Sequence, residues 1–186
     1  ALVNFKLKGM VMSAVPFGSG HINDTFLMTL RKDDETEGRV IMQRMNKSVF
    51  KKPVELMENM LNVTSYLRKK IEEEGGDPTR ETLTVINSKQ DLPYFLDSEG
   101  QYWRCVNYVE DSVTYDEVKC PDDFYQSAVA FGNFQRMLAD YPADTLHETI
   151  EGFHDTKARF EVFKKAVAED VCGRAASVQK EIDFFL

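Results

Sequence analysis

The first 45 residues alternate between apolar and polar positions, which is the pattern of β-strands with one buried face. An entry segment and a first strand are expected over residues 2–17. In the strand that follows, the apolar side chains of Phe26, Met28 and Leu30 share one face. A third strand is expected over residues 39–45, after the charged turn RKDDETEG. Three strands joined by short turns predict an antiparallel meander.

The repeat becomes helical after Pro53, a residue that can begin a helix at its first position. Side chains then recur every three or four positions on one predicted face, namely Met57, Met60, Leu61, Thr64, Leu67 and Ile71. Gly75 and Gly76 predict the end of this helix. Alternation resumes afterwards, and further strands are expected over residues 82–87, 92–96 and 101–109.

Helical spacing dominates the rest of the chain. Pro121 and the acidic residues after it predict a helix start, with Asp123 and Gln126 as a capping pair. The inner face of this helix is expected to carry Phe124, Ala128, Phe131, Gln135 and Leu138. A long polar segment, residues 142–156, separates it from two more predicted helices and is a candidate functional loop because of its length.

Strands gathered in the first part and helices in the second predict an α+β fold. The change of character near residue 110 predicts two parts. We expect a sheet-and-helix domain over residues 1–110 and a helical part over residues 111–186.

Composition narrows the function. The net charge of -8 argues against a nucleic-acid partner, because phosphate backbones bind basic surfaces. It leaves room for a small nucleotide pocket, where backbone amides and a metal can supply positive charge. The three cysteines are widely spaced and odd in number, which indicates reduced thiols. With no leader peptide pattern and no apolar run of membrane-spanning length, a cytoplasmic protein without a membrane partner is expected.

One turn carries candidate chemistry. Gly18 and Gly20 lie between the first two strands, in the segment VPFGSGHINDTF. Protein kinases cover ATP phosphates with such a strand–loop–strand, written G-x-G-x-x-G-x-V. Asn23 and Thr25 occupy the last two slots of that pattern; Asn tolerates positive φ and Thr is β-branched like Val. A tight hairpin turn that contains two glycines is the alternative.

The order of elements and several motifs together resemble a known family. The motifs are GSGHINDTF at 18–26, VIMQRMNKSVF at 40–50, LMEN at 56–59, YWRCVNYVEDSVTYD at 102–116, AFGNFQRML at 130–138, ETIEGFHDT at 148–156 and GRAASVQKEIDFFL at 173–186. They resemble the aminoglycoside phosphotransferase superfamily, the small-molecule branch of the protein-kinase-like fold. Within it, the chain is most similar to the bacterial N-acetylhexosamine 1-kinases.

This resemblance implies an ATP-dependent kinase that transfers a phosphoryl group to a sugar hydroxyl, with ATP and Mg²⁺ as cofactors. Residues 1–110 would be the small, nucleotide-binding lobe and residues 111–186 the first helices of the large lobe. Members of the superfamily continue with a His-Asn-Asp or His-x-Asp catalytic loop, and no such motif occurs here. The chain is therefore expected to be an amino-terminal half, inactive alone, with no catalytic residue or metal ligand of its own.

The resemblance also implies site residues. The nucleotide would contact Gly18, Ser19, Gly20, Asn23, Gln43, Asn107, Tyr108 and Val109. Gln43 stands in the slot where kinases have a phosphate-binding lysine, so the usual Lys–Glu pair is in doubt. Glu55, Glu58 and Asn59 are open candidates for the partner position of that pair, and a solvent-exposed helix face is the alternative for the two acids. Tyr108 is equally well explained as packing.

On the substrate side, the expected residues are His21, Asp111, Tyr115 and Arg159. Asp155 is better explained as a helix cap. Choline, homoserine or an aminoglycoside are alternative acceptors, and a non-catalytic nucleotide-binding module is the alternative to an enzyme. The apolar helices at 157–186 are expected to be uncovered and to form a dimer.

Overall fold

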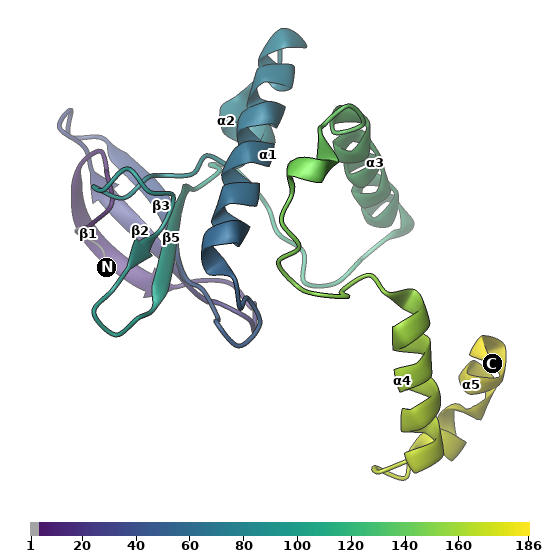
Figure 1. The fold of residues 1–186 in the computed structure, drawn as a ribbon. Helices are drawn as coiled ribbons and strands as arrows, with labels where there is room; N and C mark the ends of the chain where they lie inside the picture. Colours follow the sequence, from purple (N-terminus) through teal and green to yellow (C-terminus); the bar gives the residue numbers. More distant parts are fainter. Residues whose placement is uncertain (1–3) are drawn as a thin grey trace. The chain divides into compact units, whose positions relative to one another are not determined.

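The computed structural model describes residues 4–186, and its sheet is built from strands that lie between residues 10 and 107 (Figure 1). In these residues the strands are β1 (Met10–Pro16), β2 (Asp24–Arg31), β3 (Glu37–Arg44), β4 (Phe95–Leu96) and β5 (Tyr102–Asn107). They form one antiparallel sheet in the order β1-β2-β3-β5-β4. The α+β class and the meander of the first three strands are confirmed.

The prediction of a strand over residues 82–87 is wrong. A short helix, α2 (Pro78–Glu81), comes first, and the segment after it makes only an isolated bridge between Val85 and Val106. Its backbone is shared between two neighbours: Ile86 N donates to Cys105 O, while Asn87 O accepts from Lys6 N. Because the segment pairs with each of its two neighbours over only one or two residues, neither pairing is long enough to form a strand.

The two faces of the sheet differ in what they bury. One face carries the main core, made of Phe5, Met28, Leu30, Val40, Met42 and Cys105. Burial raises the pKa of the Cys105 thiol to about 12. Because side chains alternate along each strand, the opposite face carries Thr25, Gln43 and Arg104. Helix α1 lies beside the sheet on this polar face (Figure 1), where Arg104 contacts Met60 of the helix.

Helix α1 spans Pro53–Glu73 and begins and ends as the sequence predicts. Pro53 is its first residue. At the other end Gly75 adopts a φ of 78°, in the left-handed region that suits glycine, and Gly76 N donates to Ile71 O at 2.8 Å.

Helix α3 spans Pro121–Met137, and its last turn packs against α1. Met137 forms a small buried cluster with Leu67 and Ile71. Arg136 donates two hydrogen bonds, of 3.0 and 2.9 Å, to the carboxylate of Glu74.

The rest of α3 departs from prediction in two ways. Most of the expected inner face is exposed, with Phe124 at 68% and Phe131 at 69%, because only the last turn meets α1. Leu138, the last residue of that face, does pack against the buried cluster. The N-cap residue is Cys120, and Asp123 itself reaches back to accept from the backbone N–H groups of Lys119 and Cys120. The predicted Asp123–Gln126 capping pair is therefore wrong.

The chain divides into two compact units, residues 1–149 and 150–186. The predicted boundary after residue 110 lies inside the first unit, and as a boundary between lobes it stays a prediction. The second unit contains α4 (Thr156–Glu169), a 3₁₀ turn η3 (Ala175–Val178) and α5 (Gln179–Phe185). Asp155 caps α4 as expected, accepting from Ala158 N at 2.8 Å.

Part of the second unit's apolar surface is covered within the unit. Ile182, expected to be uncovered, is only 4% exposed, and the rings of Phe163 and Phe185 pack 6.0 Å apart between centroids. Phe185 is nevertheless 63% exposed, as expected, and its neighbours Phe184 and Leu186 are exposed as well. Among residues 4–186, none of the helices is both long and apolar enough to cross a membrane.

Candidate functional site

A cavity of about 340 Å³ opens on the polar face of the sheet, a volume within the range of small-molecule sites. Its apolar walls come from several elements and consist of Phe17, Ile41, Met60, Leu83 and Val106. Two polar side chains of neighbouring strands, Gln43 and Arg104, face into it. The segment that follows β5, residues 107–109, completes the wall together with Ser112 and Thr114. We call this cavity the sheet pocket.

Three polar side chains from three strands form a chain of hydrogen bonds at this pocket. The register of the sheet places Thr25 of β2 opposite Gln43 of β3, and Gln43 opposite Arg104 of β5. Gln43 Nε2 donates to Thr25 Oγ1 at 2.9 Å. Arg104 Nε donates to Gln43 Oε1 at 2.8 Å. Both ends of the Gln43 amide are thus engaged, which fixes its orientation.

Arg104 brings the positive charge of the pocket. Among the described residues its guanidinium has no carboxylate partner; its other contact is a long one from Nη1 to Met60 Sδ, at 3.7 Å. Burial alone lowers the pKa of Arg104, because no neighbouring acid favours its charged form. The pocket therefore contains a half-buried cation whose charge is not compensated by the protein.

The acids of α1 do not pair with position 43. Glu55 lies 3.3 Å from Lys52 Nζ, within the first turn of the helix. Glu58 lies 2.8 Å from His147 Nε2, and Asn59 bonds the backbone of His147. In the structure each of these three side chains therefore has a partner other than Gln43.

The glycine loop is held at its base and open at its tip. Phe17 N donates to Thr25 O at 2.9 Å, which closes the loop. Gly18 has a φ of 82°, and a Cβ atom at Gly18 or Gly20 would meet nothing within 4 Å. Ser19 Oγ donates to Asp116 Oδ1 at 2.7 Å. The loop thus leaves room for a ligand to approach its backbone.

Asn23 does not take the backbone conformation that the glycine-loop pattern favours at its position. The described residues with positive φ do not include Asn23, so it does not replace a glycine by adopting that conformation. Its Oδ1 atom accepts from Asn46 N at 3.0 Å and so ties the loop to the end of β3. The contact is structural.

The segment after β5 offers a backbone donor. The N–H groups of Asn107 and Tyr108 donate to Thr84 O and Arg39 O. Within residues 4–186 the N–H of Val109 has no acceptor, and Val109 lines the pocket. The Tyr108 ring packs against the Phe17 ring and lies 4.4 Å from the Arg39 guanidinium.

The predicted substrate-side residues are not gathered at the sheet pocket. His21 lines a separate polar cavity of about 540 Å³ with Asp24, Arg44, Met45 and nearby residues up to Ser48. Asp111 and Tyr115 are exposed and lie outside the lining of both cavities. Arg159 belongs to the second unit, where it donates to Phe153 O at 2.8 Å.

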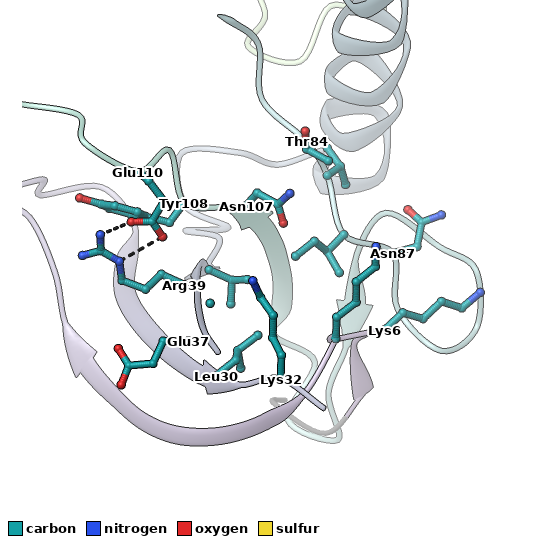
Figure 2. Close-up of a pocket in the computed structure, with 15 residues that line it drawn as sticks. Lys6, Leu30, Lys32, Glu37, Arg39, Thr84, Asn87, Asn107, Tyr108 and Glu110 are labelled. Carbon is teal, nitrogen blue, oxygen red and sulfur yellow. Dashed lines mark hydrogen bonds and ion pairs between the residues drawn. The ribbon is translucent and has the colours of Figure 1, made fainter. Parts of the chain in front are cut away.

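Another cavity, with a volume of about 680 Å³, lies at the other face of the sheet (Figure 2). Figure 2 shows its apolar floor at Leu30 and the ion pair of Arg39 with Glu110 at its rim. Its lysines, among them Lys6 and Lys32, are exposed, and Lys6 is paired with Asp91. Exposed or already paired cations bind an anion weakly, so the sheet pocket is the stronger candidate.

Sequence reasoning missed Arg104. The alternation in Tyr102–Asn107 could have placed it on the same face as Val106, but its alignment with Gln43 depends on strand register. The described part of the chain contains no group of three acidic, histidine or cysteine side chains that could hold a metal. No family model matches the chain.

Proposed function

We propose that this chain is the nucleotide-binding part of an ATP-dependent phosphotransferase with a protein-kinase-like fold. The observation that carries the proposal is the sheet pocket, in which apolar walls, a free backbone donor and an uncompensated cation converge beside a loop with two glycines. The element order, a meander, one helix and two more strands followed by helices, supports the same assignment.

Each part of the pocket matches one part of an adenine nucleotide. The apolar side chains of Ile41 and Val106 suit the faces of a purine ring. The free N–H of Val109 suits an acceptor nitrogen at the purine edge. Arg104 suits a phosphate group, since guanidinium groups bind phosphate oxygens through two parallel N–H donors.

Mg²⁺ fits these residues poorly. It prefers oxygen ligands in a near-octahedral arrangement, and residues 4–186 offer no cluster of acids near the pocket. When bound with ATP, the ion neutralises charge on the β- and γ-phosphates. Its ligands are expected outside these residues, and the residues of this chain act by binding and orienting the nucleotide.

The proposed acceptor is a sugar hydroxyl, most specifically that of an N-acetylhexosamine. This rests on the resemblance of motifs such as GSGHINDTF and is supported by the polar cavity beside His21. A neutral imidazole can donate to or accept from a hydroxyl group. Choline, homoserine and aminoglycosides are the competing acceptors.

Equilibrium binding tests the nucleotide assignment. Titration of the chain with ADP, ATP and GTP should give saturable binding of the adenine nucleotides, weak because no metal assists, and weaker binding of GTP. The absence of saturable binding for every adenine nucleotide would contradict the proposal. Turnover by these 186 residues alone is not expected, since no His-x-Asp motif is present to orient an acceptor.

The acceptor requires an activity assay on the product of the complete reading frame. ADP release with ATP, Mg²⁺ and a panel of N-acetylhexosamines, choline, homoserine and aminoglycosides should be fastest with the N-acetylhexosamines. Activity confined to choline or aminoglycosides would reject the sugar assignment and leave the phosphotransferase assignment intact.

A further inference from the structure

Arg104 is a cation that the fold partly buries without giving it a counter-charge. Moving a charged group out of water is costly unless an opposite charge or hydrogen bonds compensate. Here one bond, from Nε to Gln43 Oε1, supplies part of that compensation. The Nη1 group has only a weak sulfur acceptor, Met60 Sδ, and Nη2 has no acceptor in the described part of the chain. The outer edge of the guanidinium is thus left available at the sheet pocket.

We propose that Arg104 is the phosphate-binding cation of the sheet pocket and that Gln43 and Thr25 are the residues that position it. This inference rests on the proposed nucleotide function and adds to it the source of the positive charge. The ligand class is a nucleoside phosphate, with the guanidinium on a phosphate group and the purine against the apolar walls.

The hydrogen-bond chain explains how Arg104 is positioned. Thr25 Oγ1 accepts from Gln43 Nε2, so the Gln43 oxygen is turned toward β5, where Arg104 Nε donates to it. With Nε anchored, the guanidinium plane is fixed and its two Nη groups form the fork that suits two phosphate oxygens.

The hydrogen bonds that link Thr25, Gln43 and Arg104 give a single reason for two departures from the kinase pattern. Thr25 stands where the glycine-loop pattern has Val, and Gln43 stands where the third strand usually has Lys. A lysine at position 43 would place an ammonium group beside the Arg104 guanidinium, and like charges at that distance repel. Glutamine removes the repulsion and accepts a hydrogen bond, while Thr25 supplies the oxygen that orients the amide.

A purely structural Arg104 is the competing explanation. In that case the side chain would fill space beside Met60, and its charge would be unrelated to any ligand. The two explanations differ in how Arg104 affects ligands with and without a phosphate group, because adenosine shares the purine and ribose of ADP but has no anionic group.

The test measures binding of adenosine and ADP by calorimetry without added metal. Arg104→Met should weaken ADP binding roughly 10- to 100-fold, the range of charge-assisted hydrogen bonds, and leave adenosine within twofold of the wild-type chain. Arg68→Met is the matched control, because Arg68 is also half-buried but bonds Thr84 Oγ1 away from the pocket. It should leave both ligands unchanged.

A second variant tests the positioning role by rescue. In the Arg104→Met background, Gln43→Lys restores a cation at position 43. The double variant should bind ADP at least threefold more tightly than Arg104→Met alone, and its affinity for adenosine should be unchanged. In the wild-type background, Gln43→Lys should weaken ADP binding, since it removes the acceptor for Arg104 Nε and adds a like charge. Thr25→Val should weaken ADP about threefold through loss of one neutral hydrogen bond.

The outcomes distinguish a failure of the proposed nucleotide function from a failure of the role proposed for Arg104. If the wild-type chain binds neither adenosine nor ADP, the nucleotide function fails and this inference fails with it. If Arg104→Met binds ADP as the wild-type chain does, or loses both ligands equally, the nucleotide function stands and the role of Arg104 is overturned. Should Arg104→Met not fold, the Nε–Hε resonance of Arg104 in the wild-type chain decides: it should shift with ADP and not with adenosine, and no shift with ADP overturns the inference.

Discussion

The carboxamide of Asn59 on α1 binds both polar backbone atoms of His147. Nδ2 donates to His147 O at 2.8 Å, and Oδ1 accepts from His147 N at 2.9 Å. The neighbouring Glu58 lies 2.8 Å from the imidazole Nε2 of the same residue. These bonds fasten the start of the long polar segment to a helix 88 positions earlier in the chain.

Asn59→Ala should release this segment. Two backbone groups of His147 lose their partner, and an exposed pair of such bonds is worth about 1 kcal/mol in total. Amide exchange of residues 142–149, followed by mass spectrometry, should accelerate at least threefold. Glu55→Gln on the same helix is the control, because within residues 4–186 the ion pair of Glu55 is with Lys52 and not with the polar segment. Unchanged exchange in Asn59→Ala would mean that other contacts hold the segment.

The two loop glycines should differ in what they tolerate. Gly18 has a φ of 82°, so Gly18→Ala should lower the free energy of unfolding by about 1 kcal/mol. Gly20 has an ordinary φ and open space around its Cβ position, so Gly20→Val should leave the unfolding midpoint in urea nearly unchanged. Chemical denaturation of both variants checks this difference, and equal destabilisation would contradict it.

Gly20→Val should nevertheless weaken nucleotide binding. A branched side chain would occupy the space through which phosphate oxygens reach the loop amides. Calorimetric titration with ADP should show a loss of at least fivefold, while adenosine is little affected. A loss for adenosine as large as that for ADP would place the loop over the purine instead.

His21 should act on the acceptor rather than on the nucleotide. In the product of the complete reading frame, His21→Ala should raise the KM for sugar about three- to tenfold, the effect of one hydrogen bond, with the KM for ATP little changed. Steady-state kinetics with each substrate varied in turn measures both values. Equal increases would count against a sugar contact.

Asp97 should make the stability of the sheet sensitive to acid. Its carboxylate accepts from Trp103 Nε1 at 2.7 Å and from the backbone of Gln101, and these bonds lower its pKa. A lowered pKa in the folded state means that this stabilisation is present above the unfolded value, near 4, and is lost as the pH falls through the folded value.

Fluorescence of Trp103, the only tryptophan, reports this titration. Below pH 4 the wild-type chain should lose free energy of unfolding more steeply than Asp97→Asn, which has no carboxylate to protonate. Urea unfolding at pH 7 and at pH 3 gives the comparison. Parallel losses in both chains would show that the bond to Trp103 does not carry the pH dependence.

Local rules predicted those elements that local chemistry determines. Pro53 and Gly75 mark the ends of α1 because one fixes φ and the other accepts a positive φ, and neither effect needs a partner. Alternation likewise predicted β2 and β3. The residues 82–87 have the same composition as a strand, yet strand formation also needs a free neighbour of sufficient length, and no local rule provides it.

Helical spacing shows which side chains share a face but not whether a partner covers that face. For α3 the period grouped Phe124 with Phe131 correctly, whereas both are exposed. Prediction of the sheet pocket from the sequence has the same limit, because spacing does not show which strands are neighbours. Gln43 was found from its slot in a motif, while Arg104 becomes a candidate only when the pairing of β3 with β5 brings the two side chains together.

The distribution of the three thiols makes the chain ready for spectroscopic labelling. Cys105 is fully buried, while Cys120 and Cys172 are exposed, one in each compact unit. At pH 7.5 a maleimide dye or a nitroxide should therefore attach to Cys120 and Cys172 and spare Cys105. The native chain thus supplies a donor and an acceptor position without engineering, and a distance distribution between the two labels, measured with and without a nucleotide, would report on the separation of the two units.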